Sequence, residues 1–220
     1  WALDRVDRLF SHPVSASLFS LFRAWHNTRS TRPDVPWSLL TLILVYAAED
    51  QELIADPNQS PFNVGERINL EDFTFEEASE LNARHGDPPP LAEPGEVQKL
   101  FDLLGGQPDL LRRAFRHLRD EKLSLDEMLA SADAPGSPFE RPLQHLQRVV
   151  EKDEALRQFV ISVLRHKPTN DAEAFSTLRA EGVVQGSVVS QATFRCELYR
   201  RWFARVFQGN TKTSWLRRWA

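Results

Sequence analysis

Acidic side chains follow two apolar stretches near the start of the sequence. Asp4 follows Trp1-Ala2-Leu3, which is typical of the last residues of a strand, and Glu49 follows the apolar run Leu39–Tyr46. Because that run does not alternate with polar residues, we expect a central strand of a parallel sheet, covered on both faces. Open sheets of this kind bind ligands at the carboxyl ends of their strands, so this edge is the first candidate site.

Glu49, Asp50 and Glu52 also form an acidic cluster just after the predicted strand. Paired carboxylates can perform acid–base hydrolysis, but such a site also needs a nucleophile or an oxyanion-binding group. The neighbouring residues supply neither group. The sequence therefore gives little support to a paired-carboxylate hydrolase.

A second candidate site is the turn Gly105-Gly106-Gln107-Pro108 between two predicted helices. Glycine stops a helix and allows a ligand to approach the backbone, while proline suits the first turn of the next helix. The free N–H groups of that next helix could receive an anion. An ordinary joint between two helices of a bundle explains the same residues. No Gly-x-x-x-x-Gly-Lys-Ser/Thr phosphate loop occurs in the sequence.

The remaining elements are mostly helical. We predict helices over 15–27, 74–85, 95–104, 109–118, 124–131, 139–165 with a break near 151–153, 171–181 and 194–207. On the first of these helices Leu18, Phe19, Leu21, Phe22 and Trp25 should face inward. We predict a short strand over 66–70 and a hairpin within 183–190. The arginines Arg112, Arg113, Arg116 and Arg119 should form a solvated face, and Ser124 with Glu127 should form a capping box.

Composition limits the classes of function. The chain has 220 residues, of which 41% are hydrophobic, and a formal net charge of −4, so global charge does not indicate nucleic-acid binding. Its single cysteine, Cys196, excludes a disulfide framework, and we expect a buried structural thiol. The sequence has no signal peptide and no apolar run near the roughly 18–20 residues of a membrane span, so we expect a cytoplasmic protein.

Several stretches resemble the bacterial AAA-like domain family, a branch near the STAND-type P-loop ATPases. The most telling is SPFNVGERINLEDFTFEEASEL, which resembles the segment after the fourth core strand of that family. The Gly-x-Pro turn and the closing stretch Arg195–Phe203 follow in the family's order, and the resemblance reaches about Phe207. It implies a mostly helical chain with a partial α/β core: a truncated parallel P-loop-type sheet (1–73), a helical lid (74–134), a winged-helix-like domain (135–207) and a tail or linker (208–220).

The resemblance also implies roles for individual residues. Asp4 matches the Walker B aspartate that holds Mg²⁺, but Arg5 stands where the family has the glutamate that polarises water. A guanidinium cannot act as a base, so hydrolysis should be impaired. Ala47-Ala48 replaces the family's sensor hydroxyl before Glu49. The residues expected near a bound nucleotide are Asn63, Arg67, Gly105, Gly106, Gln107 and Pro108.

The leading hypothesis is a fragment of a nucleotide-dependent signalling switch. In the intact protein ATP or ADP with Mg²⁺ would bind between core and lid, a Walker A segment would lie upstream, and fused effector or sensor domains would read the state. We expect this chain alone to bind nucleotide weakly and to hydrolyse no ATP. One alternative is a non-enzymatic protein-interaction module with a decayed nucleotide site. Another is a winged-helix DNA-binding protein that uses Arg200 and Arg201, although the resemblance implies that this domain is a lid that rotates against the nucleotide core.

Overall fold

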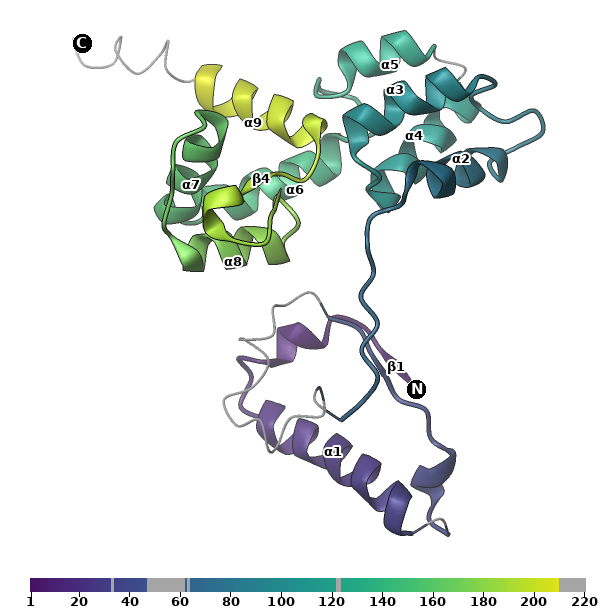
Figure 1. Ribbon diagram of the computed structural model, residues 1–220, viewed down its shortest axis with the longest axis vertical. Coiled ribbons are helices and arrows are strands. Elements are labelled where there is room, and N and C mark those ends of the chain that lie inside the picture. The colour runs from purple at the N-terminus through teal and green to yellow at the C-terminus, as the bar shows by residue number, and fades with distance from the viewer. Residues whose placement is uncertain (33, 47–61, 63, 122–123, 210–220) are drawn as a thin grey trace. The chain divides into compact units, whose positions relative to one another are not determined.

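The computed structural model describes residues 1–32, 34–46, 62, 64–121 and 124–209. Helices predominate in these residues, which confirms the mostly helical prediction (Figure 1). The chain divides into two compact units, Trp1–Leu70 and Glu71–Ala220. The further boundary that we predict at residue 134 stays a prediction.

The first unit contains a small parallel sheet and one long helix. Its elements are β1 (Ala2–Leu3), η1 (Val6–Leu9), α1 (Ser15–Thr31), η2 (Pro36–Leu39) and β2 (Ile43–Leu44). Strand β1 pairs with β2 in parallel, with Ala2 opposite Ile43. Val6, Phe19 and Phe22 form the buried centre, against which Leu18 and Trp25 pack. The inward face predicted for α1 is therefore right except at Leu21, which is 44% exposed.

The apolar run that contains β2 is covered on one face only. Leu42, Leu44 and Tyr46 pack on the buried centre, whereas Ile43 is 53% and Val45 41% exposed. The prediction that both faces are covered is wrong for the residues described, because side chains alternate across a strand and α1 shields one set. The strand predicted at 66–70 is also absent: these residues take no regular structure, and Leu70 is 87% exposed.

Capping residues set the ends of helices in the second unit. These helices are α2 (Phe75–Ala83), α3 (Pro94–Leu104), α4 (Pro108–Glu121), α5 (Leu125–Ser131), α6 (Glu140–Glu151), α7 (Glu154–Leu164), α8 (Ala172–Ala180) and α9 (Glu197–Gly209). Thr74 with Glu77 caps α2. Ser124 with Glu127 forms the capping box that we predict for α5. Asp153 caps α7, which confirms the break predicted in the long helix.

One hydrophobic core runs through the second unit. It includes Leu100 of α3, Phe115 of α4, Phe139 before α6 and Phe203 of α9, all fully buried. Helix α9 packs against both α3 and α7, so the last helix joins the earlier and later parts of the unit. Residues predicted to belong to the lid and to the winged-helix-like domain thus share a single core.

The second unit also contains a short antiparallel hairpin. Strand β3 (Val184–Gln185) pairs with β4 (Thr193–Phe194), with Val184 opposite Phe194. The hairpin predicted within 183–190 is wrong in its second strand, because η5 (Val189–Gln191) lengthens the connection and delays the return strand. None of the helices in the described part of the chain is both long and apolar enough to cross a membrane.

Candidate functional site

The parallel sheet brings Asp4 to the edge predicted for ligand binding. The backbone N–H of Val45 donates to the carbonyl of Leu3 (2.9 Å), and that of Val6 donates to the carbonyl of Val45 (3.1 Å). Asp4 therefore lies directly beyond β1 and beside the carboxyl end of β2. Its predicted neighbours at this edge, Ala47, Ala48 and Glu49, lie outside the described residues.

Asp4 and Arg5 are both exposed at this edge. Arg5 has φ of 57°, in the left-handed region, and turns the chain sharply from β1 into η1. Asp4 could supply one oxygen to Mg²⁺, which binds proteins through one or two carboxylates and completes its shell with water or phosphate. Within the described ranges no cluster of three or more His, Cys, Asp or Glu side chains is placed to hold a metal ion.

The Gly105-Gly106 turn is a close junction between separate segments of the second unit. The N–H of Phe73 donates to the carbonyl of Gly106 (2.9 Å), and a Cβ on Gly106 would lie 2.2 Å from the carbonyl oxygen of Phe73. A Cβ on Gly105 would lie 2.9 Å from the carbonyl oxygen of Arg195. Positive φ angles of 66° and 80° add a second requirement for glycine at 105 and 106. The turn thus contacts the segment before α2 and the segment before α9.

Gln107 has a structural role that the sequence did not reveal. Its side-chain Oε1 accepts a hydrogen bond from the N–H of Leu110 (2.6 Å), and its carbonyl accepts one from Leu111 (3.0 Å). The first turn of α4 is therefore already capped by its own chain. An anion at this helix start would have to share the donors with Gln107.

An ion pair ties the two segments that flank the turn. Arg195 donates from Nε to Asp72 Oδ2 (2.9 Å) and from Nη2 to Asp72 Oδ1 (2.6 Å), and the two side chains are only 28% and 24% exposed. Hydrogen bonding to Asp72 raises the pKa of Arg195 above its ordinary value. Sequence reasoning missed this pair, because 123 positions separate its members and neither belongs to a local pattern.

The basic residues of α9 are paired with acids. Arg200 donates to Glu197 (2.6 Å), Arg201 donates to Asp133 (2.8 Å), and Arg205 lies 3.6 Å from the same carboxylate. Arg201 also donates to the carbonyl of Leu129 (3.0 Å). These contacts neutralise the side chains on which the DNA-binding alternative depends, so the structure gives that alternative no support.

Cys196 is a buried free thiol, as predicted. Burial raises the pKa of the thiol to about 12. We therefore expect no reaction of the folded protein with a thiol-specific disulfide reagent at pH 8 over an hour, and rapid, stoichiometric reaction in urea, because only the thiolate reacts. Absorbance of the released thiol measures both rates. Complete labelling of the folded protein within minutes would contradict the buried, protonated thiol.

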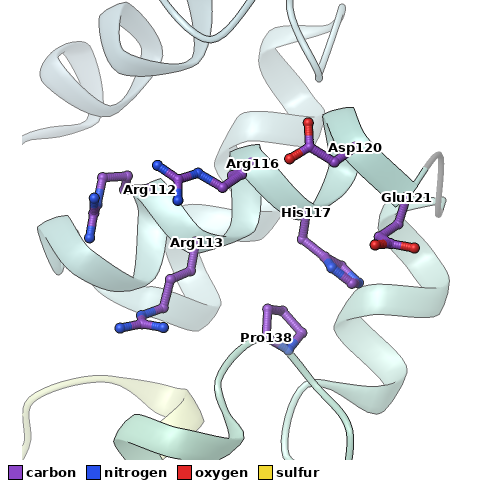
Figure 2. Close-up of a pocket in the computed structure, with 7 residues that line it drawn as sticks. All are labelled: Arg112, Arg113, Arg116, His117, Asp120, Glu121 and Pro138. Atoms are coloured by element: carbon purple, nitrogen blue, oxygen red, sulfur yellow. The ribbon is translucent and has the colours of Figure 1, made fainter.

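A hollow of ≈ 440 Å³ lies along one side of α4. The helix lines it with Arg112, Arg113, Arg116, His117, Asp120 and Glu121, and Pro138 lies across from them (Figure 2). Asp109 holds two of the arginines, with Arg112 Nη2 at 2.9 Å and Arg113 Nε at 2.6 Å. The basic residues here were expected to form a plain solvated face. The segment that carries Pro138, which local helical periodicity could not place, turns that face into a hollow.

Comparison with known proteins gives the family. Residues 1–205 match the AAA-like domain family. This chain belongs to that family. An uncharacterised WD-repeat-containing protein of Synechocystis is 33% identical over 115 residues, which is 50% of this chain and 9% of the relative. No solved structure matches the chain.

The AAA-like candidate residues fall in different parts of the structure. Asp4 lies in the first unit, and Gly105, Gly106, Gln107 and Pro108 lie together in the second. Arg67 is exposed in the segment that follows the sheet, and Asn63 lies outside the described residues. The structure thus brings the turn residues together and places Asp4 at a strand end. Arg195, Asp72 and the hollow on α4 add sites that the family resemblance did not indicate.

Proposed function

We propose that this chain is part of a nucleotide-dependent switch. In the intact protein, ATP or ADP would contact the Gly105–Pro108 turn, and Asp4 would bind the accompanying Mg²⁺. The chain spans only 9% of its WD-repeat relative, so we also propose that it works within a larger protein whose other domains sense the signal or carry the response.

One observation carries this proposal: the turn expected to meet the nucleotide is a junction of three segments. The backbone at Phe73, the α3–α4 turn and the backbone at Arg195 lie in direct contact there. A ligand that displaces the turn must therefore displace the segments before α2 and before α9 as well. Packed junctions of this kind change between discrete arrangements, which is what a switch requires.

We expect the intact protein to bind nucleotide even though this chain has lost residues that ATP hydrolysis needs. Mg²⁺ would neutralise phosphate charge when bound. Arg5 stands beside Asp4, where the family has the glutamate that polarises water, and a guanidinium cannot take a proton from water, so hydrolysis should be impaired. We expect the 220-residue chain to show no ATP turnover above the background of an Asp4→Ala variant, measured as released phosphate. Metal-dependent turnover that Asp4→Ala abolishes would contradict this expectation.

The decisive experiment is calorimetric titration of the intact parent protein with ADP and with Mg-ATP. We expect binding of both, and we expect Asp4→Asn to weaken Mg-ATP by about tenfold while ADP without metal is unchanged, because one charge-assisted metal contact is lost. Asp34→Asn is the matched control: Asp34 is an exposed carboxylate paired with Arg32 and should leave both affinities unchanged. Absence of heat with either nucleotide would overturn the switch.

A second candidate function is a protein-interaction module. The exposed apolar face of Ile43 and Val45, together with the 91% exposed Leu39, favours it, since such faces mark contacts with other protein surfaces. The calorimetric experiment separates the two functions. A module whose nucleotide site has decayed would release no heat with ADP or ATP.

A further inference from the structure

The hollow on α4 separates its charges along its length. Arg112 and Glu121 are nine positions apart, which is about 13 Å along the helix axis. Arg112, Arg113 and Arg116 lie at one end, and Asp120 and Glu121 lie at the other. Figure 2 shows the guanidinium groups of Arg112 and Arg116 extending toward the same side of the helix, away from Glu121. One end of the hollow is therefore strongly basic.

The pairing of these groups leaves positive charge available. Asp109 is shared by Arg112 and Arg113, so a single carboxylate serves two guanidinium groups. Asp120 accepts a hydrogen bond from Arg119 Nε (2.8 Å), and Arg119 does not line the hollow. Neither Arg116 nor His117 makes a side-chain hydrogen bond or ion pair with a residue that the structure describes. Hydrogen bonding to Arg119, together with the charges of Arg116 and His117, lowers the pKa of Asp120, so Asp120 offsets part of the positive charge. The basic end still holds three guanidinium groups and one carboxylate.

From this arrangement we propose that the basic end of the hollow binds the phosphate group of a small phosphate-bearing molecule. Guanidinium groups present paired N–H donors in the geometry of phosphate oxygens, and two or more of them on adjacent turns can bind one dianion. Arg116 makes the principal contact, and Arg112 supplies the neighbouring charge one turn away. His117 and Pro138 border the remaining space.

The size and lining of the hollow favour a small molecule. Its ≈ 440 Å³ lies within the usual range of about 300–1,000 Å³ for small-molecule sites and exceeds what inorganic phosphate alone would fill. Six of its seven lining residues are charged or polar, and Pro138 is the exception, so the ligand is polar throughout. This site lies beyond the nucleotide-contacting turn of the proposed function and does not depend on it.

The test is calorimetric titration of the 220-residue chain with pyrophosphate and with inorganic phosphate at constant, low ionic strength. We expect pyrophosphate to bind more tightly than phosphate, and Arg116→Gln to weaken pyrophosphate at least about tenfold, as loss of a charge-assisted contact predicts. Arg116→Lys should retain part of the affinity, because lysine keeps the positive charge but lacks the paired N–H donors of the guanidinium group. Helical circular dichroism should be unchanged in both variants, since Arg116 is exposed.

The matched control is Arg148→Gln, which removes an exposed arginine from α6 in the same unit. Equal weakening by Arg148→Gln and Arg116→Gln would show general charge attraction and overturn the site. Absence of pyrophosphate binding would also overturn it. If a phosphoserine peptide binds to the chain and neither pyrophosphate nor phosphate does, the proposed small-molecule ligand is wrong and the ligand is a phosphorylated protein. No nucleotide is used in these titrations, so a negative result would not contradict the proposed nucleotide-dependent switch.

Discussion

Gly106→Ala should destabilise the second unit by about 3 kcal/mol or more, the largest effect that we expect from the addition of a single methyl group. The new Cβ would lie 2.2 Å from the carbonyl oxygen of Phe73, and that oxygen is backbone, so it cannot rotate away. Gly106 also has φ of 80°, which alone costs a residue with a Cβ about 1–2 kcal/mol. Urea unfolding followed by helical circular dichroism measures the loss.

Gly95→Ala is the matched control for this substitution. Gly95 lies in the first turn of α3, and no atom lies within 4 Å of the position that its Cβ would take. Alanine there should leave the stability unchanged or raise it by about 0.5 kcal/mol, because it lowers the entropy of the unfolded chain. If the two variants unfold at the same urea concentration, the turn is not the tight junction described above.

Breaking the Asp72–Arg195 pair should cost about 2 kcal/mol of unfolding free energy for either Asp72→Asn or Arg195→Gln. The pair is bidentate and mostly shielded from water. Each single variant therefore leaves one charged side chain partly buried without an oppositely charged partner. The double variant should cost less than the sum of the two single variants by about 1 kcal/mol, since the second change removes that unmet charge. Urea unfolding of the four proteins gives the coupling free energy.

The Arg84–Glu80 pair supplies the reference for that cycle. It lies at the C-terminal end of α2, where Arg84 is the C-cap residue, with side chains 73% and 62% exposed. Its coupling free energy should be about 0.3–0.5 kcal/mol, because water screens it and holding two long side chains costs entropy. Equal coupling in the two cycles would mean that Asp72 and Arg195 act as an ordinary surface pair and do not fasten the segments around the turn.

Local signals explain why most helices could be predicted. Capping residues such as Thr74 and Ser124 satisfy helix N–H groups within four positions, and Gly105 ends α3 through its own φ preference. The strand predictions that were wrong depend on contacts with more distant residues. The return strand of the hairpin starts at Thr193 because η5 occupies the connection, and residues 66–70 contain strand-forming types but make no strand pairing.

The same distinction applies to the candidate sites. Asp4 could be placed at a strand end from the apolar residues before it, and the Gly105–Pro108 turn could be recognised from its own four residues. The shielded face of β2 could not be predicted, because exposure of Ile43 depends on which surface α1 covers. The hollow on α4 was missed because Pro138 approaches from a segment with no periodic link to that helix.

The sequence by itself determined the helical character of this chain, most helix ends, the buried thiol and the AAA-like order of its motifs, since each depends on residues close together in the chain. Only the tertiary structure decided that Gly106 contacts Phe73, that Arg195 binds Asp72 and that the arginines of α4 line a hollow. These contacts join positions from tens of residues to more than a hundred residues apart. Their energies arise from desolvation and close packing, which exist only once the chain has folded.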